Sequence, residues 1–316
     1  MKKKLIVIAS VVLALAVLAG GAYAYVVIAN PFHRNDLTGF AQANPVEHSQ
    51  IAPMHLNGDG EFVVLQFTDT HLVNTRGQDA RTLRMIAYHT ARVKPDLVVI
   101  TGDMIEGRSA RYHLNVDRHA ALHGIAGIFE RLGQPWAFTP GNNDHEFMGS
   151  AQDVVAFLAY HYDYFLVSNE PDLPGAVNFV IDLQGEHQLI FIDSLSRHEI
   201  MQQSQAGWLA AQLQNGVPSS VFFHYNTPMF YQAGYRFQGR PGDDLIDEVV
   251  LAANNVGLVS VGHTHPLEHW LAHVNGTYFS IARASGYQRG DDYPGGLVIT
   301  IRPGAEEPYS FYDFAF

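Results

Sequence analysis

The sequence contains no cysteine among its 316 residues. This absence excludes disulfides, cysteine nucleophiles and zinc sites that are built on thiolates. The chain does hold 17 histidines. If it binds metal ions, the ligands must therefore be imidazole, carboxylate and amide groups, and such ligands suit Zn, Mn, Fe or Ni.

Positive charge is also scarce, with 19 lysines and arginines against 31 acidic residues and a net charge of −12. We therefore do not expect nucleic acid as a partner, because its phosphate backbone selects basic surfaces. A small anionic substrate remains compatible with this charge, since a bound metal ion reverses the local sign. The hydrophobic fraction of 47% predicts a sizeable buried core, in one large domain or two ordinary ones.

The N-terminus has the pattern of an export signal. Lys2, Lys3 and Lys4 precede an apolar stretch that runs from Leu5 to Ala29, as a charged region precedes the apolar region of a secretory signal. The stretch is also long enough to span a bilayer, which takes ~20 residues. We predict that residues 1–29 are a signal peptide or an N-terminal membrane anchor; a buried core helix is the third alternative. The lysines then stay inside, and the rest of the chain is exported to the cell envelope, periplasm or extracytoplasmic face, anchored or secreted.

Residues 30–58 have no periodic pattern and are predicted to be a linker. From Glu61 onward, short β-branched and aromatic runs alternate with helical patterns, which indicates an α/β domain over residues 59–303. Residues 304–316 are predicted to be a tail or a short packing strand. The expected strands are 62–67, 97–101, 135–139, 178–182, 188–192, 221–223, 257–261, 278–282 and 297–301, and the expected helices are 79–93, 116–132, 151–160, 205–214 and 243–254.

Polar residues gather directly after five of the expected strands. Ligands of open α/β sheets bind outside the carboxyl ends of the strands, so these five segments are expected to meet in one place. Each segment alone is weak evidence, because an isolated Asp or His after a strand is usually a cap or a turn residue. The five segments read TDTH with Asp69 and His71, GDM with Asp103, GNNDHE with Asn142, Asn143 and His145, FFH with His224, and GHTH with His263 and His265.

This ordered set resembles the pattern of the calcineurin-like metallophosphoesterase superfamily, which reads D-x-H, G-D, G-N-H-D/E, H and G-H-x-H. The resemblance covers roughly residues 60–303, and VFFH is similar to a block of the purple acid phosphatase branch. It implies a four-layer αββα sandwich, in which two β-sheets lie between helices. It also implies a centre of two divalent transition-metal ions at the edge of the sheets.

Carried over residue by residue, the resemblance implies two ligand sets. Asp69, His71 and His265 would hold one ion, whereas Asn142, His224 and His263 would hold the other, and Asp103 would bridge the two. The implied activity is hydrolysis of a small phosphomonoester or phosphodiester by a metal-bound hydroxide. The alternative is a catalytically weak or inactive binding module of the same fold at the cell envelope.

Two positions depart from the family pattern. Asn143 stands where the family has a histidine that is often credited with protonating the leaving group, and an amide cannot transfer a proton at neutral pH. His145 could take over this role or could be a surface histidine. Glu106 stands where purple acid phosphatases have a tyrosine ligand, so we expect a divalent pair rather than a ferric centre. A basic group after Asp103 is either a substrate-binding set or a solvated face: Arg108, Arg111, His113 and Arg118.

Overall fold

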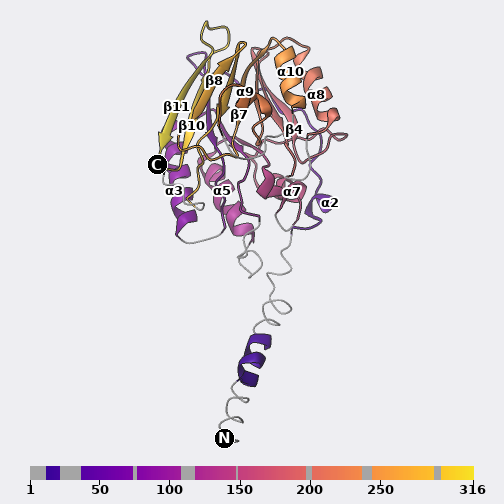
Figure 1. Cartoon of the computed structure of the whole chain (residues 1–316), viewed down its shortest axis with the longest axis vertical. Coiled ribbons are helices and arrows are strands. Elements are labelled where there is room, and N and C mark those ends of the chain that lie inside the picture. Colours follow the sequence, from indigo (N-terminus) through magenta and orange to yellow (C-terminus); the bar gives the residue numbers. More distant parts are fainter. Residues whose placement is uncertain are drawn as a thin grey trace, which may run out of the picture.

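The computed structural model describes residues 12–21, 37–73, 77–107, 118–146, 149–196, 201–236, 244–287 and 293–316. Within these residues, two β-sheets pack face to face and helices cover the outer face of each sheet (Figure 1). This is the four-layer α/β arrangement that the family pattern implies.

The first sheet has the strand order β11-β10-β1-β2-β3. Its central strand β1 pairs in parallel with β2 and antiparallel with β10. Because β1, β2 and β3 are parallel, their carboxyl ends lie at the same edge. The strands are β1 (Phe62–Phe67), β2 (Leu97–Thr101), β3 (Trp136–Thr139), β10 (Gly295–Ile301) and β11 (Tyr309–Ala315).

The second sheet has the strand order β4-β5-β6-β7-β9-β8. Strands β5, β6, β7 and β9 are parallel neighbours, whereas β4 and β8 pair antiparallel at the two edges. The strands are β4 (Asn178–Leu183), β5 (His187–Ile192), β6 (Ser219–Phe222), β7 (Val256–Val261), β8 (Trp270–Val274) and β9 (Thr277–Ile281).

Four of the described helices cover the two sheets. Helices α3 (Gln78–Val93) and α5 (Arg118–Leu132) pack on the first sheet. Their buried apolar residues belong to the same hydrophobic cluster as the apolar residues of that sheet. Helices α8 (Gln203–Leu213) and α10 (Leu245–Ala252) cover the second sheet through a separate hydrophobic cluster. The remaining helices are α2 (Phe40–Ala43), α6 (Asn142–His145), α7 (Ala151–His161) and α9 (Pro228–Gln232).

The inner strands are apolar on both sides because both of their faces are covered. All five residues of β2 are buried, which explains why its sequence reads LVVIT without alternation. Gln66 in β1 is an exception that links the two sheets: it donates to Thr101 Oγ1 at 2.9 Å and accepts from Ser260 Oγ of β7 at 2.7 Å. A buried polar side chain is tolerated here because its amide group is hydrogen-bonded.

Part of the predicted linker lies along the domain. Leu37 is buried in the main hydrophobic cluster. The backbone N–H of Ala41 donates to Asp153 Oδ1 at 2.9 Å, and that of Met54 donates to the carbonyl of Asp182 at 2.9 Å. Residues 37–58 therefore belong to the packed structure rather than to a free spacer.

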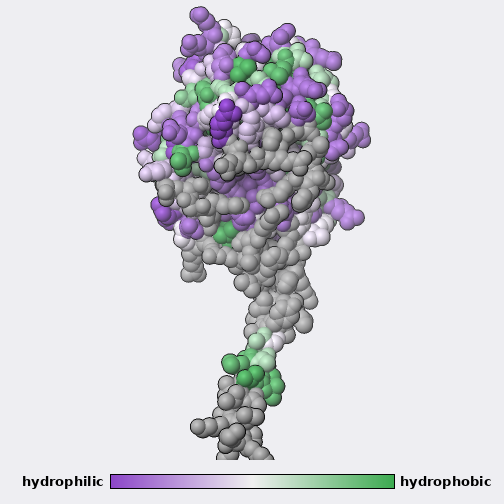
Figure 2. Space-filling view, in the orientation of Figure 1, coloured by the Kyte–Doolittle hydropathy of each residue, from purple (hydrophilic) through white to green (hydrophobic). Residues whose placement is uncertain are grey.

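Residues 12–21 form a short helix with exposed apolar side chains, which is coloured green in Figure 2. Among the described residues, no helix has both the length and the apolar content that a membrane crossing requires. The remainder of the predicted signal or anchor, including its lysines, lies outside the described residues.

Candidate metal centre

The five polar segments converge where the carboxyl ends of β1, β2, β3, β6 and β7 meet at the edge of the two sheets. The loops after β1 and β2 continue side by side beyond the strands. The N–H of Asp69 donates to the carbonyl of Gly102, and the N–H of His71 donates to the carbonyl of Asp103, each at 3.0 Å. Parallel pairing thus extends into the segments that carry the predicted ligands.

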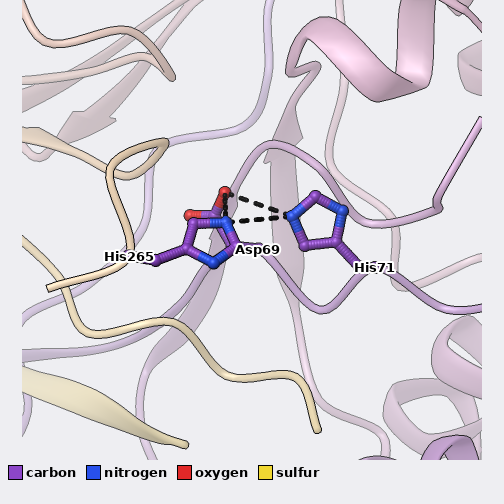
Figure 3. Close-up of side chains that lie close together, drawn as sticks. All are labelled: Asp69, His71 and His265. Carbon is purple, nitrogen blue, oxygen red and sulfur yellow. Dashed lines mark hydrogen bonds and ion pairs between the residues drawn. The ribbon is translucent and has the colours of Figure 1, made fainter. Parts of the chain in front are cut away.

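Asp69, His71 and His265 form the first group (Figure 3). Nε2 of His265 lies 3.1 Å from Asp69 Oδ1 and 3.0 Å from Nε2 of His71. The Nε2 atom of His71 lies 3.7 Å from the same carboxylate oxygen. Three possible ligand atoms therefore point toward one another, although His265 lies 196 positions after Asp69 and 194 after His71 in the chain.

Asp103, His224 and His263 form the second group. Nε2 of His224 lies 3.4 Å from Asp103 Oδ1 and 3.3 Å from Nδ1 of His263. The other ring nitrogen of His224 donates to the carbonyl of Thr101 at 2.8 Å. In the neutral ring this bond keeps the proton on Nδ1 and leaves Nε2 as the nitrogen that can bind a cation.

Asp103 lies between the two groups. Its Oδ1 faces His224, and its Oδ2 lies 3.7 Å from Nε2 of His71 in the first group. Asn142 is buried at the start of α6, and the backbone N–H of the next residue, Asn143, donates to Asp103 Oδ1 at 2.8 Å. The geometry therefore brings six of the seven predicted ligands into two neighbouring groups, with His263 and His265 in different groups. Asn142, the seventh, precedes the residue that contacts Asp103.

Five of these seven residues have a left-handed backbone, with φ of 52° at Asp69, 44° at His71, 50° at Asp103, 74° at His263 and 47° at His265. A positive φ is uncommon for residues other than glycine. Backbone strain of this kind costs on the order of 1–3 kcal/mol per residue, and it clusters at functional sites. The conformation turns each side chain toward the cluster, and the surrounding hydrogen bonds hold it there.

Two glycines allow the close approach of these loops. A Cβ atom at Gly102 would lie 2.3 Å from Nδ1 of His224, and one at Gly262 would lie 1.9 Å from Thr68 Oγ1. No side chain fits at such distances. The glycine before Asp103 and the glycine before His263 are therefore required by packing as well as by the turn.

The electrostatic field favours charged carboxylates at the centre. Burial alone would raise the pKa of Asp69 and Asp103, but the neighbouring imidazoles outweigh it and hold both pKa values well below the usual range. Burial would lower the pKa of His224, yet Asp103 raises it to about 9. The pKa of His263 falls to about 4 because the ring is buried and lies beside His224.

The donor set fits a pair of divalent cations. Within each group the possible ligand atoms all lie within 4.8 Å of one another, and all of them are imidazole nitrogens or carboxylate oxygens. The ring nitrogens of His71 and His265 face each other at 3.0 Å. Two such lone pairs repel unless a proton or a cation lies between them, and a shared cation satisfies both together with Asp69.

Asn143 and Asp144 brace Asp103 from the side of α6. The Nδ2 group of Asn143 donates to Asp103 Oδ2 at 2.6 Å. Asp144 accepts from the backbone N–H of Gly141 at 2.8 Å and from that of Ile105 at 3.1 Å. Its pKa is raised to about 7 by burial and by the nearby Asp103. The sequence analysis placed Asn143 at the site. It did not predict that Asp144 would accept hydrogen bonds from the backbone N–H groups of Gly141 and Ile105.

His145, the second candidate for an acid, ends α6 and is nearly buried. Its Nε2 lies 2.8 Å from Oδ1 of Asp193, the residue that follows β5. The ring therefore belongs to a histidine–aspartate pair beside the centre and is not a surface histidine.

Glu106 does not face the cluster as a ligand would. Its Oε2 lies 3.1 Å from Nδ1 of His71, whereas Nε2 of that ring faces Asp69 and His265. Arg108, Arg111 and His113 lie outside the described residues, as does the side chain of Arg118. Tyr225 packs against the centre, with its ring centroid 4.4 Å from that of His263.

Two curated proteins from Arabidopsis thaliana are similar to the chain. The first, named probable inactive purple acid phosphatase 28, is 24% identical over 308 residues, which cover 77% of this chain and 75% of that protein. The second, named probable inactive purple acid phosphatase 29, is 24% identical over 277 residues, which cover 69% of this chain and 70% of that protein.

Solved structures share the fold at low sequence identity. A dimetal phosphatase from Danio rerio matches with a TM-score of 0.58 and 11% identity, over 75% of this chain and 92% of that one. The protein TT1561 of Thermus thermophilus matches with a TM-score of 0.51 and 10% identity, over 80% of this chain and 98% of that one. The family model described as calcineurin-like phosphoesterase matches residues 62–267, which hold all seven predicted ligands. The chain therefore belongs to the calcineurin-like phosphoesterase family.

Proposed function

We propose that this protein is an active, metal-dependent phosphoesterase that hydrolyses small phosphomonoesters or phosphodiesters at a dinuclear centre. The observation that carries the proposal is the convergence of two groups of three ligand-type side chains around Asp103. The family uses a centre of two metal ions, and every predicted ligand position of this chain has a residue that can bind one.

The residues have separable roles in this proposal. Asp69, His71 and His265 would hold one cation, Asn142, His224 and His263 the other, and Asp103 both. When bound, two such cations lower the pKa of water and offset the negative charge of a phosphoryl group. Asn143 fixes the orientation of Asp103 through its side-chain and backbone N–H groups.

The amide at Asn143 predicts which esters react best. General acid catalysis typically contributes about 10²–10⁴-fold, and an amide supplies none of it. We therefore expect aryl phosphates, diesters and pyrophosphates to be better substrates than alkyl monoesters. His145 is the remaining candidate for an acid, and its Nε2 is paired with Asp193 Oδ1 at 2.8 Å.

The test uses the purified protein with p-nitrophenyl phosphate and bis(p-nitrophenyl) phosphate. We expect hydrolysis when Mn²⁺ is added, loss of hydrolysis with EDTA, and about two metal equivalents per chain by elemental analysis. Asp103→Asn should abolish turnover, since it removes the charge between the two groups, whereas Asp163→Asn in an exposed loop is the matched control. Full metal occupancy without turnover of either ester under any divalent metal would overturn the proposal.

That outcome would favour the second candidate, a metal-holding module without catalysis. The names of the two Arabidopsis relatives favour it, because both are called probable inactive phosphatases. Asn143 favours it as well. The complete ligand set is expected for both candidates, since each holds metal ions, so the turnover measurement decides between them.

We also propose that the domain is exported and held at the cell envelope by its N-terminal segment. Three lysines followed by an apolar stretch support this placement. Expression of the full chain with a C-terminal reporter, followed by fractionation, tests it. A reporter that stays in the cytosolic fraction, with residues 1–29 still attached, would contradict it.

A further inference from the structure

An open cleft of about 970 Å³ borders α6, the helix that carries Asn142 and Asn143. It is lined by His145 of α6, by residues 150 and 152 at the start of α7, by the loop 171–175, by residues 195 and 196 after β5, and by residues 202 and 204 at the start of α8. None of the predicted metal ligands lines it, so the cleft is a feature in addition to the centre.

Two structural links make the cleft a neighbour of the metal site. The short helix α6 carries Asn143, which is bonded to Asp103, and His145, which lines the cleft. On the other side, the N–H of Tyr225 lies 3.4 Å from Ser194 Oγ, and the Tyr225 ring packs on His263. The residue after Ser194 lines the cleft. The cleft and the centre are therefore connected through α6 and through residues 194 and 195.

The described lining combines apolar surface with neutral hydrogen-bonding groups. The apolar part consists of Pro171, Leu173, Pro174 and Leu195. The neutral polar part consists of three hydroxyls and two amides, from Ser150, Gln152, Ser196, Gln202 and Ser204, and His145 and Asp172 add an imidazole and a carboxylate. A pyranose ring has apolar faces and hydroxyls around its edge, and it matches such a mixed wall better than an alkyl chain or a flat aromatic ring.

The charges at the described part of the cleft are unfavourable for a second anion. Asp193 does not line the cleft but is buried behind it, and its two oxygens accept from His145, Leu195 and Ala176. Asp172 is an exposed carboxylate on the rim, and no described lining residue is a lysine or an arginine. A carboxylate on the bound molecule would meet like charge here, which weakens binding.

We propose that this cleft binds the alcohol part of the substrate and selects a neutral, hydroxyl-rich ring of the size of a sugar. The proposal rests on the proposed phosphoesterase function and adds a substrate class to it. Hydrolysis would consume one water, break the bond between phosphorus and the ester oxygen, and release the sugar and inorganic phosphate. A sugar 1-phosphate suits the amide at Asn143, because its ring oxygen makes the anomeric oxygen a better leaving group than an ordinary alcohol.

Glucose 1-phosphate and glucuronic acid 1-phosphate provide a matched pair of probes, since they differ only in one CH₂OH or carboxylate group. We expect the kcat/KM of the Mn²⁺-loaded protein to be roughly tenfold higher for glucose 1-phosphate. Asp172→Asn should narrow this ratio several-fold, and the exposed Asp163→Asn should leave it unchanged. Equal values for the two esters, or a preference for the glucuronic acid ester, would overturn the proposal.

The hydrogen-bonding wall is tested with Gln152→Leu. This variant should lower the kcat/KM of glucose 1-phosphate relative to that of phenyl phosphate by roughly three- to tenfold, the value of one net hydrogen bond. Gln214→Leu, at the opposite end of α8, is the control. If phenyl phosphate is hydrolysed and Gln152→Leu leaves this ratio unchanged, the cleft proposal fails and the proposed function stands.

If no ester is hydrolysed, the proposed function fails, and binding then decides about the cleft. Ligand-observed NMR with the Zn²⁺-loaded protein should give saturation transfer to the ring protons of glucose 1-phosphate. Gln152→Leu should reduce this signal, whereas Gln214→Leu should not. Transfer that is absent, or unchanged by Gln152→Leu, would overturn the cleft assignment without reference to turnover.

Discussion

Glu106 Oε2 lies 3.1 Å from Nδ1 of His71, while Nε2 of the same imidazole faces Asp69 and His265. A carboxylate at the outer nitrogen of a ligating histidine fixes the ring orientation and makes the inner nitrogen a stronger donor. The residue at the position where purple acid phosphatases carry a tyrosine ligand thus contacts a predicted ligand of this chain, His71, from its outer side.

Glu106→Gln should therefore weaken metal binding at the first group without removing the second. Loss of such an outer partner typically costs about 10–100-fold in metal affinity. Titration of the metal-free protein with Co²⁺, followed by visible absorption, should show one of two binding events shifted to higher concentration. Glu248→Gln on the exposed side of α10 is the control, and two unshifted events in Glu106→Gln would contradict the assignment.

Asn143→His should restore a proton donor and broaden the substrate range. We expect turnover of an alkyl monoester such as glycerol 3-phosphate to rise by about tenfold or more, because general acids matter most for poor leaving groups. Turnover of p-nitrophenyl phosphate should change much less. The measurement is the ratio of the two kcat values, and an unchanged ratio would count against the role given to the amide.

Gly262→Ala should disrupt the centre through sterics alone. The new Cβ would lie 1.9 Å from Thr68 Oγ1 and 2.7 Å from Asp69 Oδ2, so the loop that carries His263 and His265 must move. We expect a loss of about 1–3 kcal/mol in the free energy of unfolding, typical of overpacking, together with loss of bound metal.

Gly207→Ala is the matched control for that variant. Nothing lies within 4 Å of a Cβ at this position in α8, and alanine is favoured over glycine in a helix by about 1 kcal/mol. Denaturant unfolding should therefore show this variant to be as stable as the wild type or more stable, with metal content unchanged. Equal behaviour of the two variants would show that Gly262 is not sterically constrained.

We expect the free energy of unfolding to fall in mild acid because of His187. Burial between the sheets lowers its pKa from the ordinary 6.5 to about 4, and its ring contacts Ser220 Oγ at 2.9 Å. Between pH 6.5 and pH 4 the unfolded chain binds a proton at this residue and the folded chain does not. The free energy of unfolding therefore falls as the pH falls through this window, by about 3 kcal/mol from this group.

Replacing the histidine isolates that contribution. His187→Asn should be less stable than the wild type at pH 7, but it should lose about 3 kcal/mol less between pH 7 and pH 4. His273→Asn, exposed on β8, should follow the wild-type pH profile. Parallel profiles for the wild type and His187→Asn would contradict the prediction.

Most of the strands could be predicted from the sequence, because a strand that is buried on both faces consists mainly of apolar residues. β2, buried on both faces, was predicted with its observed bounds, 97–101. β8 was not expected, because Trp270–Val274 is an edge strand with alternating half-buried and exposed residues and includes a histidine. Helix α6 was expected as a turn, since the four residues NNDH gain their helical form from contacts with the Asp103 loop rather than from propensity.

Within the site, the chain pattern identified the residues but not all of their partners. The resemblance to the family pattern placed His263 and His265 in different groups, as the structure does. The contact between His145 and Asp193 joins residues 48 positions apart, and nothing in the local sequence signals it. The support of His71 by Glu106 depends on how two adjacent loops run beyond their strands, which only the three-dimensional structure shows.

The antiparallel pairing of β1 with β10 constrains the order in which the molecule can mature. β1 carries Asp69 and His71 at its end, but one of its edges stays uncovered until Gly295–Ile301 has been synthesised. An uncovered strand edge invites pairing with other chains. The loop that carries Asp69 and His71 is thus synthesised early, whereas its strand is enclosed only after residues 295–301 have been made, later than the predicted ligands His263 and His265.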